Sequence, residues 1–437
     1  MKKKYVRWTL WTIASPFILF VILCILIYLP PVQNFLVDKA AVYASEATGM
    51  NISVGRISLS FPLNLVVTDV DAASPHKDTL FSVRRLQVNV QLLPLLKKQV
   101  EVDGISLQGA TVNSNDLIHG MKLNGTLGEL FISSHGVALD PETAIVNKVL
   151  LKDTDLSLCL NDTAAADTAA SDTTYWKIIL QDIDLQNVSF ALDMPLDSLS
   201  LAASLDNATL RDGLIDLHKS AYSLQTFRIK NGRVRYDSGK LLAASPADSL
   251  PSGLDPSHIA LTDIGVKLDS LHYEGRNMKA VISQFVLKER SGLEIVSTTG
   301  RLSSNGKVLR VPSLKLETRD SYLELNAAMD WDVLDFKNEG LVSARLMADI
   351  GKPDVVRFMG SMDEKFVRQY PSEPLRIRTG IDGDLNKLKL TTLTAELPGA
   401  MELFARGELT YLTDSLLRGG DITLEAETKD LKFVSTL

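Results

Sequence analysis

The chain has 437 residues, of which 45% are hydrophobic and 6% aromatic, and its 46 basic and 53 acidic side chains give a formal net charge of -7. This length is too great for one compact core, so we expect two or more domains or one elongated repeat body. The negative charge argues against a nucleic-acid partner, which needs a basic face to neutralise phosphates. Frequent, regularly spaced apolar residues exclude disorder for most of the chain.

The N-terminus has the pattern of a membrane anchor. A basic tail, residues 1–8, precedes an apolar run over residues 9–29 that carries no charge. About 20 such residues span a bilayer core as a helix, whereas a cleaved signal peptide has an apolar region of about 7–15 residues. A buried core helix seldom lacks charge over this length. The sequence therefore predicts a single-pass transmembrane helix over 9–29, with the tail in the cytoplasm and the main body outside it.

Residues 31–49 have helical periodicity. Val32, Phe35 and Leu36 begin an apolar stripe, Pro31 suits the start of a helix and Gly49 suits its end. We predict a short amphipathic helix that either packs on the body or caps the membrane-side end of a sheet.

From residue 50 onward the apolar residues alternate with polar ones, which is typical of strands with one apolar and one polar face. Leu86, Val88 and Val90 alternate with Gln87 and Asn89. A second run has apolar residues at Leu323, Leu325, Ala327 and Met329. The fold class predicted is mostly β, with the transmembrane and amphipathic helices followed by an elongated, curled antiparallel sheet. Residues 352–369 are the one modest helix candidate within this body.

A short sequence pattern recurs along the body: two aliphatic or aromatic positions, a turn former, and another apolar residue. Its four copies place Gly109, Asp153, Asn187 and Asn231 at the turn-forming position. We interpret the pattern as a tight turn or bulge between strand segments of a repeat architecture. Four dipeptides predict turns between strands, Asn124-Gly125, Asn231-Gly232, Asn305-Gly306 and Asp382-Gly383.

Two segments interrupt the strand pattern. Residues 161–174 are rich in Ala, Asp and Thr and predict a flexible loop, and residues 241–257 are rich in Pro, Ser and Asp and predict a linker or long loop. The predicted organisation is a first β section over 50–240 and a second over 258–437.

We find no catalytic or metal-binding signature in the sequence. The six histidines lack metal-ligand spacing, and no GxSxG or phosphate-binding loop occurs. The pairs Asp153/Asp155 and Asp182/Asp184 could in principle hold a metal, but their place within the strand pattern favours a polar face beside turns. Cys24 and Cys159 cannot form a disulfide framework. We expect neither an enzyme nor a cofactor or metal site.

The apolar strand faces therefore become the candidate site. Such a face must be buried against a second sheet, a helix layer or a non-protein ligand. Composition does not separate a sandwich or solenoid from an open groove for acyl chains. The groove candidates are Leu86, Val88, Val90, Ile105, Leu107, Leu185, Leu323, Leu325, Ala327 and Met329.

The order of several weak motifs resembles the N-terminal part of AsmA-like proteins, most closely of the TamB type. The motifs are the anchor, the segments Thr48–Ile52 and Gly55–Leu59, the run from Thr299 to Leu325, and the segment Ile381–Leu385. The resemblance implies a bacterial inner-membrane anchor and a taco-shaped β-groove in the periplasm. It also implies transfer of phospholipids toward the outer membrane, with an outer-membrane β-barrel as a possible partner. The alternative is a scaffold that assists the assembly of outer-membrane proteins.

TamB-type proteins are usually far longer and end in a further C-terminal domain. This chain ends at Leu437 after strand-like repeats, so we expect either that it is a fragment or that it needs a partner to complete a path across the periplasm.

Overall fold

The computed structural model of the protein describes residues 39, 41–43, 45–46, 48–60, 64–74, 79–91, 102–114, 120–138, 142–161, 175–239, 253–336, 340–359, 364–430 and 432. The predicted basic tail 1–8 and the predicted transmembrane segment 9–29 lie outside these residues. Within them, no helix has the length and apolar character needed to cross a membrane.

Only part of the predicted amphipathic helix 31–49 is described, and that part is helical. Lys39, residues 41–43, residues 45–46 and Thr48 have helical conformation. The backbone N–H of Gly49 donates to the carbonyl of Ser45 at 2.9 Å, and Gly49 has φ +70°, as expected of a glycine that ends a helix.

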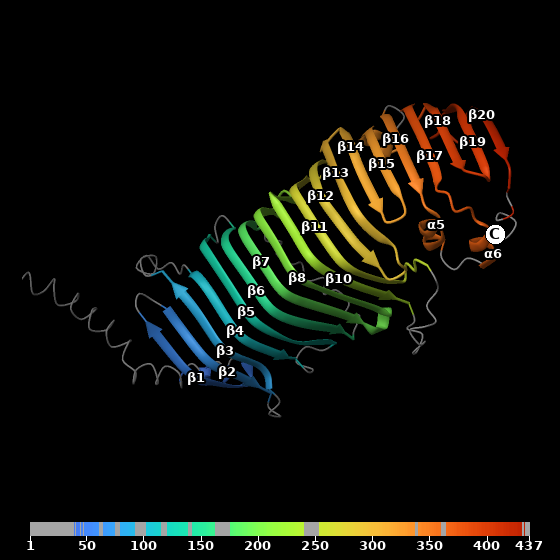
Figure 1. Ribbon diagram of the computed structural model, residues 1–437. Helices are drawn as coiled ribbons and strands as arrows, with labels where there is room; N and C mark the ends of the chain where they lie inside the picture. The colour runs from blue at the N-terminus through green and yellow to red at the C-terminus, as the bar shows by residue number, and fades with distance from the viewer. Residues whose placement is uncertain are drawn as a thin grey trace, which may run out of the picture. The chain divides into compact units, whose positions relative to one another are not determined.

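The body divides into two compact units, residues 1–166 and 167–437. Unit 1 contains strands β1 (Asn51–Ser60), β2 (Asn64–Ala73), β3 (Thr79–Val90), β4 (Val102–Asn113), β5 (Met121–Ala138) and β6 (Thr143–Leu160). Each strand pairs antiparallel with the next along the chain. Unit 1 is therefore an antiparallel meander (Figure 1).

Unit 2 is a longer antiparallel meander. Its strands are β7 (Lys177–Met194), β8 (Leu199–Asp216), β9 (Ala221–Leu224), β10 (Thr226–Ser238), β11 (His258–Glu274), β12 (Asn277–Glu289), β13 (Glu294–Asn305), β14 (Val308–Thr318), β15 (Tyr322–Asp330), β16 (Leu341–Ile350), β17 (Leu375–Asp384), β18 (Lys387–Leu397), β19 (Met401–Thr410) and β20 (Gly419–Thr428). The prediction of a mostly β, antiparallel fold is confirmed.

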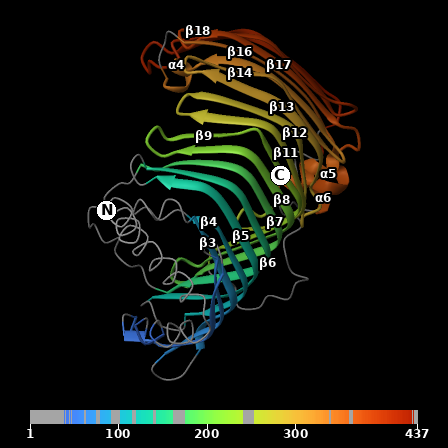
Figure 2. The same ribbon diagram turned by 90° about the vertical axis from the view of Figure 1, so that its left-hand side faces the viewer.

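Unit 2 also contains a few short helices. These are the 3-10 helix η1 (Pro195–Asp197), α4 (Trp331–Leu334), α5 (Lys352–Phe358) and α6 (Glu364–Gln369). The last two fall within the segment 352–369, where the sequence indicates a helix. Figure 2 shows α4 at one end of the strands of unit 2, and α5 and α6 at the other end.

The division between the units falls inside the predicted loop 161–174. The predicted linker or long loop 241–257 connects β10 to β11 within unit 2. These two strands pair along their length, with Phe227 opposite Leu268 and Asp237 opposite His258. A segment joining two paired neighbours cannot separate two sheets, whatever its proline and serine content.

The recurring sequence pattern marks a left-handed residue in the middle of a strand. Gly109, Asp153, Asn187 and Asn231 have φ between 50° and 61°, and they lie inside β4, β6, β7 and β10 rather than between strands. The interpretation as a turn between strands is therefore wrong. The register shift that a bulge produces occurs at Asn231, in its pairing with β11, whereas Gly109 and Asp153 keep an unbroken register with β5, and Asn187 keeps one with β8. Glycine, asparagine and aspartate fill these positions because they tolerate left-handed backbone.

Each left-handed residue shifts the alternation of apolar and polar side chains by one position along the strand. In β4 the apolar positions are Ile105 and Leu107 before Gly109, then Ala110 and Val112 after it. The register on either side is unbroken, with Leu107 opposite Leu130 and Ala110 opposite Leu127. One apolar face therefore continues through the irregular position.

Three of the four predicted turn dipeptides also lie inside strands. Asn305-Gly306 forms the turn between β13 and β14, whereas Asn124-Gly125, Asn231-Gly232 and Asp382-Gly383 belong to β5, β10 and β17. At Gly125 the reason is close packing, because a Cβ atom there would lie 2.3 Å from the carbonyl oxygen of Asp155. Glycine here marks a close approach between strands.

The left-handed position 153 provides a test of this account. Asp153 has φ +50°, and the Cβ of any residue replacing Gly128 would lie 2.8 Å from the Cβ of Asp153. We expect Asp153→Val to lower the free energy of unfolding of unit 1 by about 1–2 kcal/mol, because a β-branched residue is strained in this conformation. Asp153→Gly should change it by less than about 1 kcal/mol. Urea unfolding followed by circular dichroism measures both, and equal effects of the two variants would contradict the assignment.

Candidate functional site

One face of the unit 1 sheet carries rows of aliphatic side chains that cross all six strands. Residues that pair directly across an antiparallel sheet project from the same face. One row consists of Ile57, Val67, Leu86, Leu107, Leu130 and Leu151, and its neighbour consists of Leu59, Leu65, Val88, Ile105, Ile132 and Val149. We call this surface, and its counterpart in unit 2, the apolar face.

The opposite face of unit 1 differs sharply in chemistry. Beside the left-handed positions it carries a polar row, Arg56, Thr68, Arg85, Gln108, Glu129 and Lys152. This row contrasts with the two aliphatic rows, so the two sides of the sheet face different surroundings.

The apolar face recurs in unit 2. One row across its later strands is Leu316, Leu323, Ala348, Ile377, Ala395, Leu403 and Ala426, and the next is Leu314, Leu325, Leu346, Thr379, Leu393, Ala405 and Leu424. Thr379 is the one polar member of these fourteen positions. A threonine keeps a methyl group, so the surface stays largely aliphatic.

The predicted groove residues lie on these faces. Leu86, Val88, Ile105 and Leu107 belong to the two rows of unit 1, and Val90 pairs with Val102 after a register shift. In unit 2, Leu323, Leu325, Ala327 and Met329 share one face of β15. They pair with Ala348, Leu346, Ala344 and Val342 of β16. Leu185 pairs with Ala208, which pairs in turn with Ile229.

The aliphatic side chains of the apolar face are only half-buried. All twelve residues of the two rows in unit 1 retain partial exposure, as do Leu314, Leu316, Leu323 and Leu325 in unit 2. The buried members, such as Ala327, Ala348 and Ala405, are small residues hidden between larger neighbours. A sheet covered by a second layer would bury its central leucines completely, so the described residues provide no such layer here.

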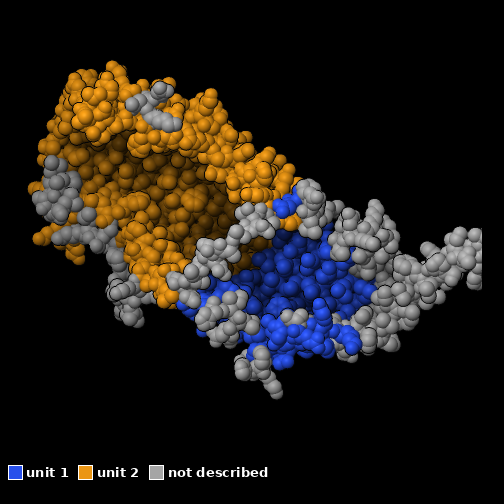
Figure 3. Space-filling model, turned by 180° about the vertical axis from the view of Figure 1, so that it is seen from behind, with its two compact units in different colours: residues 1–166 blue, residues 167–437 orange. Residues whose placement is uncertain are grey.

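The sheet contacts agree with this conclusion. Apart from short helices at the ends of strands, the main contacts of each described strand are with its neighbours in the same sheet. Figure 2 shows the strands of unit 2 following a curve, and Figure 3 shows this unit hollowed on the side that faces the viewer.

Helices α5 and α6 cover the apolar face at one end of β17–β19. Phe366 and Tyr370 form a buried cluster with Leu397 and Ala400, and Leu375 and Met401 pack against it. Burial raises the pKa of the Tyr370 hydroxyl. This is the local hydrophobic core of the last strands, and it lies at their ends rather than over the middle of the face.

A buried carboxylate ties α5 to the neighbouring strands. Asp354 is 1% exposed, accepts hydrogen bonds from the hydroxyls of Thr318 and Ser321, and lies 2.8 Å from Nη1 of Arg357. The same Arg357 nitrogen lies 2.9 Å from Asp320. Burial opposes ionisation of Asp354, but the two hydroxyls and the guanidinium outweigh it and lower the pKa of the carboxyl. The pKa of Arg357 is correspondingly raised, despite burial, by Asp320 and Asp354.

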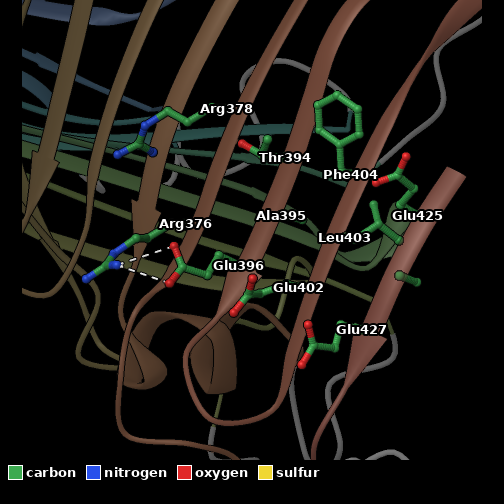
Figure 4. Close-up of a pocket in the computed structure, with 11 residues that line it drawn as sticks. Arg376, Arg378, Thr394, Ala395, Glu396, Glu402, Leu403, Phe404, Glu425 and Glu427 are labelled. Carbon is green, nitrogen blue, oxygen red and sulfur yellow. Dashed lines mark hydrogen bonds and ion pairs between the residues drawn. The ribbon is translucent and has the colours of Figure 1, made fainter. Parts of the chain in front are cut away.

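The charged face of unit 2 has a depression of its own. Figure 4 shows it over β17–β20, with Arg376 and Glu396 paired at 3.4 Å and with Glu402, Glu425 and Glu427 on the adjacent strands. Most of the side chains that line it are charged. The remaining lining includes Ala395, Leu403, Phe404 and Ala426, so the depression is mixed in chemistry, unlike the aliphatic rows.

The aspartate pairs considered as metal ligands have other partners. Arg211 forms ion pairs with both Asp182 and Asp184, and Asp153 occupies a left-handed strand position. Among the described residues, no three histidine, cysteine or acidic side chains come together in a group that could hold a metal ion. Cys159 is a free thiol.

Sequence reasoning missed the larger part of the apolar face. It did not assign Ile57, Val67, Leu130 or Leu151, although each completes a row with predicted residues. These residues could have been found from the spacing of apolar residues. Within a run in which every second residue is apolar, one interval is three residues long, as from Val54 to Ile57. An interval of this kind marks the phase shift at the irregular position opposite a left-handed residue.

No protein-family model matches this sequence, and no curated protein shows significant similarity to it.

Proposed function

We propose that this protein holds and passes the acyl chains of phospholipids along its apolar face, as a membrane-anchored component of the bacterial cell envelope. The observation that carries this proposal is the set of aliphatic rows that cross successive strands and keep partial exposure to solvent. The proposed ligand supplies the covering layer that the described residues do not.

The chemistry of the face suits acyl chains. Exposed apolar surface costs about 25 cal/mol per Å² in water, so a long aliphatic face needs an apolar occupant. Leucine, isoleucine, valine and alanine side chains offer no directional hydrogen bonds, which allows a hydrocarbon chain to move along the rows without a fixed binding position. The charged opposite face, with pairs such as Arg376 and Glu396, keeps the other side of the sheet in water.

The proposed groove is the curved sheet with its apolar face inward. Figure 2 shows the strands of unit 2 following a curve, and Figure 3 shows a hollow on one side of this unit. The proposal is that the sheet curls toward its apolar face, so that the aliphatic rows line this hollow.

The anchor and direction of transfer complete the proposal. The apolar run 9–29 after a basic tail supports insertion in the inner membrane, with the body in the periplasm. The resemblance to AsmA-like proteins of the TamB type supports transfer of phospholipids toward the outer membrane, with an outer-membrane β-barrel as a candidate partner. The net charge of -7 argues against a nucleic-acid partner.

A photocrosslinking experiment tests the proposal directly. A photoreactive amino acid replaces Leu325 on the apolar face. A matched probe replaces Glu324, which lies on the other face of the sheet and pairs with Lys315 of β14. The full chain is purified in detergent, irradiated and digested, and its crosslinked products are identified by mass spectrometry. We expect phospholipid at position 325 at least tenfold above position 324.

Each other outcome overturns the proposal. Equal lipid capture at both positions would show adventitious detergent-like binding, and no lipid at either would show that the face is covered by protein. Crosslinked polypeptide at 325 in place of lipid would move the scaffold function, assistance to the assembly of outer-membrane proteins, ahead of lipid transfer.

A further inference from the structure

Two loops at one end of the unit 2 strands expose large apolar side chains to solvent. The first joins β15 to β16 and includes α4, and the second joins β19 to β20 over residues 411–418. Both loops lie at the same end of the strands. Leu341, where the first loop ends, pairs with Asp384 next to the β17–β18 turn, and Lys387 after that turn pairs with Thr410, where the second loop begins. We define the apolar lip by six residues, Leu334, Phe336, Leu341, Tyr411, Leu416 and Leu417.

The loop 411–418 presents two adjacent leucines in a fixed conformation. Leu416 is 93% exposed and Leu417 is 59% exposed. Their backbone N–H groups donate to one carboxylate oxygen of Asp414, at 2.8 and 3.2 Å, and the guanidinium of Arg418 donates to the carbonyl of Leu412 at 3.0 Å. The loop is also joined to the β17–β18 turn, because Tyr411 N–H donates to the Asn386 carbonyl at 3.0 Å. A flexible loop could fold its leucines inward, whereas this one is held with both of them outward.

The loop between β15 and β16 is built in the same way. Phe336 is 79% exposed and has φ +56°, and Leu341 is 61% exposed. The neighbouring Asp335 pairs with Arg276, whose guanidinium also lies over the ring of Trp331 at 5.2 Å from its centroid. These contacts fix the loop to the β11–β12 turn and leave the phenylalanine in solvent.

We propose that the apolar lip inserts into the surface of a lipid bilayer and docks this end of the unit 2 strands on a membrane. This surface is separate from the apolar face, and the docking stands independently of acyl-chain transfer. Isolated aliphatic and aromatic tips on fixed loops penetrate the headgroup region, where their apolar area leaves water. Tyr411 places an amphipathic ring at the depth typical of a membrane interface.

The shape and charge of the lip favour a membrane over a protein partner. The apolar side chains project from two separate loops, with the charged β17–β18 turn residues Asp384 and Lys387 between them, so they form points rather than one contiguous patch. Protein interfaces bury an apolar centre of matched shape. The loop 411–418 carries one acidic and one basic side chain, Asp414 and Arg418, so a zwitterionic bilayer needs no excess of anionic lipid to accept it.

The test follows the environment of the loop tip in the full chain. Ser415→Cys, in a background with Cys24→Ser and Cys159→Ser, is labelled with the fluorophore NBD, and the chain is held in phosphatidylcholine nanodiscs. Phosphatidylcholine vesicles with a doxyl quencher on the acyl chain are then added. We expect a blue shift and quenching at position 415. A label at Asp197→Cys, beside the exposed Leu196 of η1 at the opposite end of the strands, should show neither a blue shift nor quenching.

The decisive variant is Leu416→Asp/Leu417→Asp with the same label. We expect its vesicle concentration for half-maximal quenching to rise at least about tenfold per leucine withdrawn from the bilayer. The matched control, Leu196→Asp, removes an equally apolar side chain with 63% exposure and should leave the response unchanged. Crosslinking of lipid at position 325 in the same variant should persist, which separates docking from the groove.

Absence of quenching in the parent chain, or equal quenching at 197 and 415, would overturn the proposal. A blue shift that depends on protein concentration and needs no vesicles would assign the lip to a contact between copies of the chain instead.

Discussion

Leu107→Asp combined with Leu325→Asp should lower phospholipid transfer by the full chain about 100-fold. The two leucines lie on the apolar faces of units 1 and 2, each between two leucines of the neighbouring strands. A carboxylate in contact with hydrocarbon costs about 2.5–3.5 kcal/mol, which corresponds to roughly a 100-fold loss of occupancy by an acyl chain. The measurement is the rate at which pyrene-labelled phosphatidylcholine moves from vesicles that contain the chain to acceptor vesicles.

The matched control adds the same charges to the other face. Gln108 pairs with Arg85 and Glu129, and Asn326 pairs with Arg345, so Gln108→Asp/Asn326→Asp changes the polar face at adjacent positions. This variant should transfer lipid at a rate within about twofold of the parent, because its charges stay in water. Circular dichroism verifies that both variants keep their strands. Unchanged transfer by the Leu107→Asp/Leu325→Asp variant would refute passage along the apolar face.

Asp354→Ala is expected to be the most destabilising single change in unit 2. Asp354 is 1% exposed and holds the hydroxyls of Thr318 and Ser321 together with Arg357. Its removal leaves the hydroxyls of Thr318 and Ser321 without their acceptor and leaves Arg357 with Asp320 alone, which we expect to cost about 3 kcal/mol. Urea unfolding should show this loss, and hydrogen exchange should show it first in α5, where residues 352–358 lose their tie to β14 and to the β14–β15 turn.

The double replacement Asp354→Leu/Arg357→Met separates the ion pair from simple packing. Two apolar side chains of similar volume should recover most of the stability, since neither leaves a buried charge. The dependence on pH gives an independent measure. The pKa of Asp354 is lowered in the folded chain, so its contribution is complete above the ordinary value of about 4 and is lost as the pH falls through the folded pKa. The parent should therefore lose stability below about pH 4 more steeply than the double variant. Parallel pH profiles would contradict the role given to Asp354.

Much of the fold could be predicted from local patterns. Alternation in the segments around Val88 and Leu325 predicted strands, and Leu323 to Met329 do share one face of β15. The helical pattern at 352–369 predicted the segment that forms α5 and α6. These predictions succeeded because side-chain alternation depends only on backbone geometry within a few residues.

The turns were less predictable because the same residue types serve two purposes. Asn231-Gly232 has the sequence of a hairpin turn, yet Asn231 is a left-handed residue within β10 and Gly232 lies opposite Ile264. Asn305-Gly306 has the same sequence and does form a turn. Local preference permits a left-handed backbone in both cases, and the pairing of the flanking residues with other strands determines which structure forms.

The sequence by itself determined the strand periodicity, the positions where left-handed backbone is tolerated, and the uncharged apolar run over residues 9–29. Each of these depends on neighbouring residues and on the backbone they allow. Only the tertiary structure decided that Leu86, Leu107 and Leu130 form one row, that α5 and α6 cover only one end of the apolar face, and that Leu416 and Leu417 point into solvent. Those features depend on register between strands and on which surfaces remain uncovered, because contacts between distant segments set both.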